Sequence, residues 1–130
     1  MKVEKFEDLE IWIIARELCK FIFEITEKLP FSKDYKFRDQ IRSASGSIMD
    51  NIAEGFERGG NKEFMQFLSI AKGSCGETRS QSYRAFDFNY INQDSFDKIN
   101  IESINLSKKI SSLMSYLKQS EFKGSKFHKP

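Results

Sequence analysis

The residues best able to do chemistry form one polar stripe along a predicted helix at about residues 36–58. On a helical wheel its members fall within about 60° of one another: Gln40, Ser47, Asn51, Glu54 and Arg58. The stripe borders an apolar one, and polar groups at such an edge need hydrogen-bond partners if they are buried. We therefore expect a network that links the stripe to Ser74, Glu77 or Arg79 of the next helix, or to another subunit.

Two other interpretations of this polar stripe stay open. It could be a ligand or nucleic-acid site lined by Arg42, Arg58 and Asn51, or it could be a plain solvated face. Replacement of Asn51 by alanine separates the network from the site. Strong destabilisation would support the network, whereas intact folding with lost binding would support the site.

Catalysis fits these residue types poorly. Glu54 and Glu77 could act as paired carboxylates in acid–base chemistry. The chain has a single histidine, His128, close to its C-terminal end. Histidine triads and histidine-rich metal clusters are therefore nearly excluded within one chain. We predict a protein that is not an enzyme and that uses no cofactor and no metal.

The charge balance bears on nucleic-acid binding. Lys and Arg number 21 against 19 Asp and Glu, so the net charge is only +2 and a single chain is a weak charge-driven binder. The positive surplus lies in the second half of the chain and in its tail, where Lys123, Lys126 and Lys129 alternate with Phe122 and Phe127. These residues could grip phosphates and stack on bases, although a solvated tail is the simpler interpretation. An oligomer would multiply such contacts through avidity.

The apolar spacing predicts the elements that position these residues. Positions three and four apart repeat over about residues 8–29, 36–58, 61–88 and 94–120, which indicates four long helices. Leu29-Pro30 and Gly59-Gly60 are expected to end the first two helices, and Asn61 and Asp94 to cap the last two. The apolar spacing stays in phase across residues 73–76 despite two glycines, so the third helix is predicted to be continuous. The sequence thus predicts an all-α, antiparallel up-down four-helix bundle over residues 1–120, followed by a flexible basic tail at 121–130.

The first predicted helix is apolar over about 200° of the wheel, whereas one buried face needs about 100°. We therefore expect this helix to have a second burial partner, and we predict a subunit interface made of its second apolar series. That series is Ile11, Ile14, Leu18, Phe21 and Ile25.

The cysteines and the N-terminal sequence indicate the cellular compartment of the protein. Cys19 and Cys75 lie far apart with no CxxC motif, so both are interpreted as buried free thiols of a reducing compartment. The chain starts without the apolar region of a secretory signal and has no apolar run long enough for a membrane span. We expect a cytoplasmic protein with no membrane association.

Several motifs within about residues 6–91 carry a family resemblance. They are Phe6-x-x-Leu9-x-x-Trp12, Leu29-Pro30, Asp39-Gln40-Ile41-Arg42, Ser47-Ile48-x-x-Asn51-Ile52-Ala53-Glu54-Gly55-Phe56-x-Arg58 and Lys62-Glu63-Phe64-x-x-Phe67-Leu68-x-x-Ala71-x-Gly73-Ser74-x-x-Glu77. In these motifs the chain resembles the bacterial four helix bundle protein family, also called the 23S rRNA intervening-sequence protein family. Ser43 departs from the family's usual arginine, and Cys75-Gly76 from a more common apolar pair.

The resemblance implies a four-helix bundle that assembles as a homopentamer. Some family members are encoded in intervening sequences of 23S rRNA genes, and a related branch assists a reverse transcriptase. No catalytic residues carry over from the family. Two functions therefore stay open. One is a ribosome-related, non-catalytic protein that binds RNA or DNA, and the other is an adaptor or scaffold for a protein partner, such as a reverse-transcriptase-type enzyme. RNA affinity that falls with salt would support the first, and a co-purifying protein without RNA binding the second.

Overall fold

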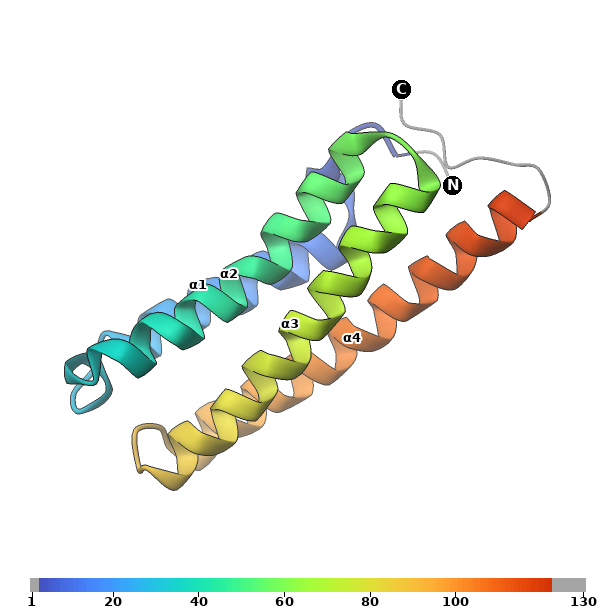
Figure 1. The fold of residues 1–130 in the computed structure, drawn as a ribbon. Helices are drawn as coiled ribbons and strands as arrows, with labels where there is room; N and C mark the ends of the chain where they lie inside the picture. Colours follow the sequence, from blue (N-terminus) through green and yellow to red (C-terminus); the bar gives the residue numbers. More distant parts are fainter. Residues whose placement is uncertain (1–2, 123–130) are drawn as a thin grey trace.

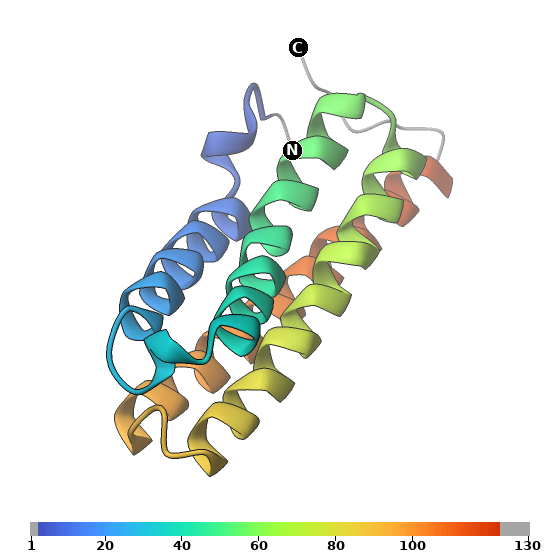
Figure 2. The same cartoon turned by 60° about the vertical axis from the view of Figure 1, so that its left-hand side comes forward.

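The computed structural model describes residues 3–122, which form four long helices. They are α1 (Glu10–Thr26), α2 (Tyr35–Arg58), α3 (Asn61–Asp87) and α4 (Gln93–Phe122), with two 3-10 turns at Phe6–Asp8 and Phe31–Lys33. Successive helices run antiparallel beside one another (Figures 1 and 2). No strand occurs in this range. The predicted all-α four-helix bundle is confirmed.

The helix ends follow local signals. Asp34 precedes α2, and its Oδ1 accepts a hydrogen bond of 3.3 Å from the Phe37 amide. Gly59 ends α2 with a φ of 88°, a left-handed conformation that glycine adopts at little cost. α3 is continuous through Gly73 and Gly76, as the spacing predicted. Packing along its full length therefore outweighs the low helix propensity of these glycines.

Two predicted helix caps are wrong. Asn61 is the first residue of α3 rather than its cap, and it is buried, with its Nδ2 3.5 Å from the Leu117 carbonyl oxygen in α4. The α4 helix begins at Gln93, before Asp94, and the Asn92 side chain accepts a hydrogen bond of 2.9 Å from the Ser95 amide. At α3 the preceding Gly60 offers no side-chain cap and Asn61 contacts α4 instead, whereas at α4 the side chain of Asn92 takes the capping role predicted for Asp94.

The hydrophobic core runs the length of the bundle and draws on all four helices. Its fully buried members include Ala15, Ile22, Ile41, Ile48, Ile52, Leu68, Leu106 and Ile110. The end of the bundle where α1 meets α2 and α3 meets α4 is closed by aromatic rings. Phe31 lies 5.1 Å from Phe37 and 5.0 Å from Tyr90 between ring centroids, and the Tyr90 hydroxyl donates to Asp34 at 2.9 Å. Thus two of the chain's thirteen phenylalanines, Phe31 and Phe37, close this end of the core.

α2 and α3 pack closely because one glycine lies between them. A Cβ atom added at Gly55 would lie 2.6 Å from the Phe67 Cβ and 3.0 Å from a ring carbon of Phe64. No larger residue fits without moving a helix backbone. Gly55 belongs to the Asn-Ile-Ala-Glu-Gly motif, so the close approach gives this part of the motif a structural reason.

The predicted subunit interface on α1 needs correction. Ile11, Leu18 and Ile25 are only 5%, 2% and 6% exposed, because they are buried inside their own chain. α1 contacts both α2 and α4, and these two neighbours occupy its wide apolar face. Ile14 and Phe21 are half-buried against the same core. The large apolar side chains that α1 does expose are Ile13 and Phe23.

One further property of the helices concerns membranes. Among the helices of residues 3–122, none combines the length and the apolar character needed to span a bilayer.

Candidate functional site in two grooves beside α3

The centre of the polar stripe forms hydrogen bonds within the bundle. The Asn51 side-chain amide donates to the Ser47 carbonyl oxygen at 2.8 Å and to the Ser47 hydroxyl at 2.9 Å. The hydroxyl of Ser74, on α3, donates to the same Ser47 hydroxyl at 3.0 Å. The structure therefore brings Ser47, Asn51 and Ser74 together as a link between α2 and α3.

The ends of the stripe do not join this link. Arg58 pairs with Glu54 at 2.9 Å on the surface, where both side chains are about half exposed. Gln40, near the other end, accepts a long hydrogen bond of 3.4 Å from Arg84. Glu77 receives a similarly long one from Gln81, also 3.4 Å. Glu54 and Glu77 thus have separate partners, and the structure does not assemble them as a catalytic carboxylate pair.

Arg42 lies on another side of α2 from the stripe. Its Nε donates to the Thr26 hydroxyl at 2.8 Å, and its Nη2 lies 3.2 Å from a Glu27 carboxylate oxygen. The guanidinium carbon is 4.2 Å from the centre of the Phe23 ring. Arg42 therefore links the C-terminal end of α1 to α2. It does not line a common site with Asn51 or Arg58.

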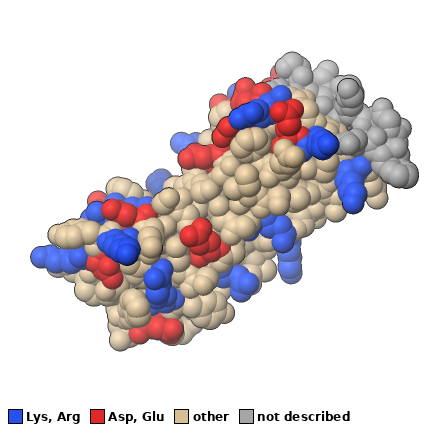
Figure 3. Space-filling view, viewed as in Figure 1, with Lys and Arg blue, Asp and Glu red and all other residues tan. Residues whose placement is uncertain are grey.

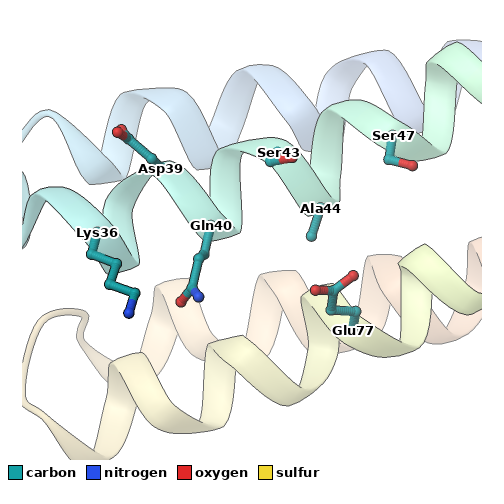
Figure 4. A pocket seen from close by; sticks show the side chains of 7 residues that line it. All are labelled: Lys36, Asp39, Gln40, Ser43, Ala44, Ser47 and Glu77. Carbon is teal, nitrogen blue, oxygen red and sulfur yellow. The ribbon is translucent and has the colours of Figure 1, made fainter.

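The groove between α2 and α3 is open and mixed in charge. It holds about 490 Å³ and is lined by Lys36, Asp39, Gln40, Ser43, Ala44, Ser47 and Glu77. In Figure 4, Lys36 and Gln40 extend from α2 toward α3 and Glu77 extends from α3 toward α2, whereas Asp39 points away. Lys36 and Glu77 enter the groove from opposite helices at well-separated positions along it, so its lining carries both charges.

The groove between α3 and α4, hereafter the α3–α4 groove, is different. It holds about 330 Å³ and is lined by Lys72, Cys75, Gly76, Arg79, Ser103, Ile104, Ser107 and Lys108. Three of these residues are cations and none is a carboxylate. No salt bridge within residues 3–122 involves Lys72, Arg79 or Lys108. Over the middle of α4 in Figure 3 the coloured side chains are blue.

The base of the α3–α4 groove is buried and partly polar. Ser103 is 1% exposed, and its hydroxyl has no hydrogen-bond partner in the part of the chain that the structure describes. Cys75 is also 1% exposed, and burial raises the pKa of its thiol to about 12. At neutral pH the groove therefore has cations at its rim and only neutral groups at its base.

Sequence reasoning placed Arg79 in the α2–α3 network, whereas the structure places it in the α3–α4 groove. It missed Lys72, Ser103 and Lys108 altogether. A signal was present on α3, because Lys72, Gly76, Arg79 and Tyr83 follow one another at helical spacings of four, three and four. The predicted contacts Lys123, Lys126 and Lys129 lie outside the described residues.

No cluster of three or more His, Cys, Asp or Glu side chains suited to a metal ion occurs among residues 3–122.

Residues 7–112 match the profile of a family described as 23S rRNA-intervening sequence protein. Among solved structures, a protein of unknown function from the S23 ribosomal protein family of Bacteroides thetaiotaomicron has a similar fold. Its TM-score is 0.72 at 21% identity, over 80% of this chain and 97% of that one. No curated protein matches the sequence.

Proposed function

The chain belongs to the 23S rRNA-intervening sequence protein family, and from this premise we propose that it is a non-catalytic helical-bundle protein that associates with RNA. The observation that carries the proposal is the α3–α4 groove, where Lys72, Arg79 and Lys108 lie without a carboxylate. Cations gathered on one face are the electrostatic footprint of nucleic-acid binding. The net charge of the whole chain is only +2. Because three cations gather at this groove, they support a positive electrostatic potential there.

We further propose that the protein works as a homo-oligomer, and the family resemblance implies a pentamer. Large apolar side chains exposed on three helices support contacts with other chains: Ile13 at 48%, Ile70 at 52% and Ile101 at 65%. Each added copy would present another cationic groove to the same RNA and so increase avidity. Light scattering on the purified protein tests this, because a mass of 15.2 kDa at micromolar concentration would contradict it.

The second candidate is an adaptor or scaffold for another protein, such as an accessory subunit of a reverse-transcriptase-type enzyme. It is favoured by the same exposed apolar side chains, with Ile101 of α4 the most exposed of those three. A co-purifying protein partner together with absent RNA binding would select this alternative. In either function we propose a cytoplasmic location, which agrees with two free cysteines, Cys19 and Cys75.

The test of RNA association is a fluorescence anisotropy titration of a labelled oligoribonucleotide at several salt concentrations. A triple variant replaces Lys72, Arg79 and Lys108 by alanine. We expect it to weaken binding by about ten-fold or more and to reduce the slope of log K against log salt by about 2, since each single-strand phosphate contact contributes about 0.7.

A charge-matched control replaces three exposed lysines away from the groove: Lys20, Lys28 and Lys33. This variant loses the same formal charge, so a specific groove predicts a clearly smaller loss of affinity. Equal losses in the two triple variants, or no RNA binding at low salt, would contradict the proposal. A chain truncated after residue 122 tests the tail separately, because unchanged affinity would eliminate Lys123, Lys126 and Lys129 as contacts.

A further inference from the structure

We infer that the α3–α4 groove takes a single RNA strand, with one nucleotide entering the groove, rather than a duplex lying across it. The inference rests on the proposed RNA association and adds the class of RNA and its mode of binding. It depends on three features of the groove that its charge does not explain. These are its buried hydroxyl, its open wall and a neighbouring aromatic side chain.

The buried hydroxyl belongs to Ser103 at the base of the groove. Its Oγ has no hydrogen-bond partner within residues 3–122, and the residue is 1% exposed. Buried polar groups are nearly always paired in folded proteins, so a group that enters the groove would supply the missing partner. A duplex keeps its phosphates on the outside of a wide rod and would reach only the rim. An unstacked nucleotide has the size to enter, because about 330 Å³ is within the range of small-ligand sites.

One wall of the groove is left open by Gly76, which is exposed. A Cβ atom added at this position would meet no atom within 4 Å. Packing inside the chain therefore does not require a glycine there, although glycine disfavours a helix relative to alanine. Its effect is to leave this wall of the groove unfilled. Gly73 has the same open surroundings but does not line the groove, which makes it a matched control.

The aromatic neighbour is Tyr83, one helical turn beyond Arg79 on the same face of α3. Its ring packs at 79° to that of Phe96, with 4.9 Å between the centroids, yet the side chain remains 50% exposed. Ring contact with Phe96 holds the tyrosine in place beside the cations. Lys72 and Tyr83 are 11 positions apart, which corresponds to about 16 Å along the helix axis. Such a row of cations and an aromatic side chain is typical of surfaces that bind single strands by phosphate contacts and base stacking.

The first experiment compares two RNAs with the full-length protein. A labelled 20-nucleotide oligouridine and a labelled 20-base-pair RNA duplex are titrated at the same salt concentration and followed by anisotropy. We expect the single strand to bind about ten-fold tighter, because stacking and groove entry are available only to unpaired bases. Equal or tighter binding of the duplex would overturn the inference and leave RNA association intact.

The second experiment uses variants that keep the cations. Tyr83→Ala and Gly76→Gln are each expected to weaken oligouridine binding by about ten-fold through lost stacking and a filled groove. Gly73→Gln and replacement of the exposed Tyr35 by alanine serve as controls and should bind as the wild type does. Circular dichroism and thermal melting establish that each variant is folded.

The possible results distinguish the single-strand binding mode from RNA association itself. Wild-type affinity for oligouridine in both Tyr83→Ala and Gly76→Gln would overturn the single-strand mode, while the cation variants would still report on RNA association. Loss of affinity in Gly73→Gln equal to that in Gly76→Gln would also overturn it, because the effect would then not come from the groove. A wild-type protein that binds neither RNA overturns the inference together with the function on which it rests.

Discussion

The hydroxyl of Ser74 in α3 donates a hydrogen bond of 3.0 Å to the hydroxyl of Ser47 in α2. The same Ser47 oxygen also accepts from the Asn51 amide at 2.9 Å. A hydroxyl oxygen has two acceptor positions, so these two donors occupy both of them. The centre of the polar stripe thus links two helices, and the Ser47 oxygen has no acceptor position left for a ligand. These hydrogen bonds give the centre of the stripe a structural role in joining α2 to α3.

Asn51→Ala is expected to lower the free energy of unfolding by about 1–2 kcal/mol, since two hydrogen bonds in a half-buried setting are lost. Urea denaturation followed by circular dichroism measures this loss. Glu54→Ala is the control on the same helix, because an exposed pair four residues apart contributes only about 0.3–0.5 kcal/mol. An Asn51→Ala protein of unchanged stability but weakened RNA affinity would instead make the stripe a binding site.

Gly55→Ala is expected to cost about 3 kcal/mol or more, at the upper end of overpacking effects. The added methyl group would lie 2.6 Å from the Phe67 Cβ, an atom fixed to the backbone of α3. Gly73→Ala provides the opposite case, with nothing within 4 Å of the new atom. It should raise stability by about 0.5–1 kcal/mol through helix propensity. Thermal melting of both variants compares them, and equal shifts would refute the close approach of α2 and α3.

Arg42→Ala is expected to lower stability by about 1–2 kcal/mol, because the Thr26 hydroxyl loses a donor and the Phe23 ring loses its cation. Arg42→Lys should recover only part of this loss, since an ammonium group lacks the planar guanidinium that serves both contacts. Equilibrium unfolding in urea measures both effects. Full recovery in Arg42→Lys would show that charge alone matters, which the contact geometry contradicts.

The fold could be predicted from the sequence because its signals are local and repeated. Apolar spacing gave four helices with bounds within a few residues of those observed, and Gly59 was recognised as a stop. The predicted helix caps at Asn61 and Asp94 were wrong, because the exact start of a helix depends on individual side-chain contacts that apolar spacing does not reveal. Helical spacing also identified the width of the apolar face of α1. It did not reveal that Ile11, Leu18 and Ile25 are covered by the chain's own helices, because a pattern on one helix does not identify its partners.

The candidate site was less predictable because it is built across two helices. A stripe such as that of α2 can be seen on one helical wheel, and part of it, Ser47 and Asn51, indeed forms the link to α3. The α3–α4 groove joins Lys72 and Arg79 to Lys108, which lies 36 and 29 positions away from them in the sequence. Only the packing register of α3 on α4 brings them together. The unpaired state of the Ser103 hydroxyl is likewise a property of packing and not of sequence.

Cys75 makes stability depend on pH in the alkaline range. Burial raises the pKa of its thiol from 9.0 to about 12 in the folded protein. Below about pH 9 the thiol is protonated in both the folded and the unfolded state, so it contributes fully to the free energy of unfolding. Between about pH 9 and pH 12 the unfolded chain releases the proton while the folded chain keeps it, so the free energy of unfolding falls as pH rises. Cys75→Ala removes this dependence. Urea denaturation at pH 7.5 and pH 10.5 should show a larger drop for the wild type, and equal drops would contradict the buried thiol.

The two cysteines are expected to differ in their reaction with iodoacetamide at pH 8, because alkylation requires an exposed thiolate. Burial raises the pKa of both thiols, but Cys19 is half-buried whereas Cys75 is 1% exposed. Cys19 should therefore be modified first, and Cys75 only at the rate at which the bundle opens. Mass spectrometry of peptides from a timed alkylation measures both rates. Adding urea below the unfolding midpoint should accelerate modification of Cys75 much more than that of Cys19, and modification of Cys75 ahead of Cys19 in buffer would contradict the closed packing of α3 on α4.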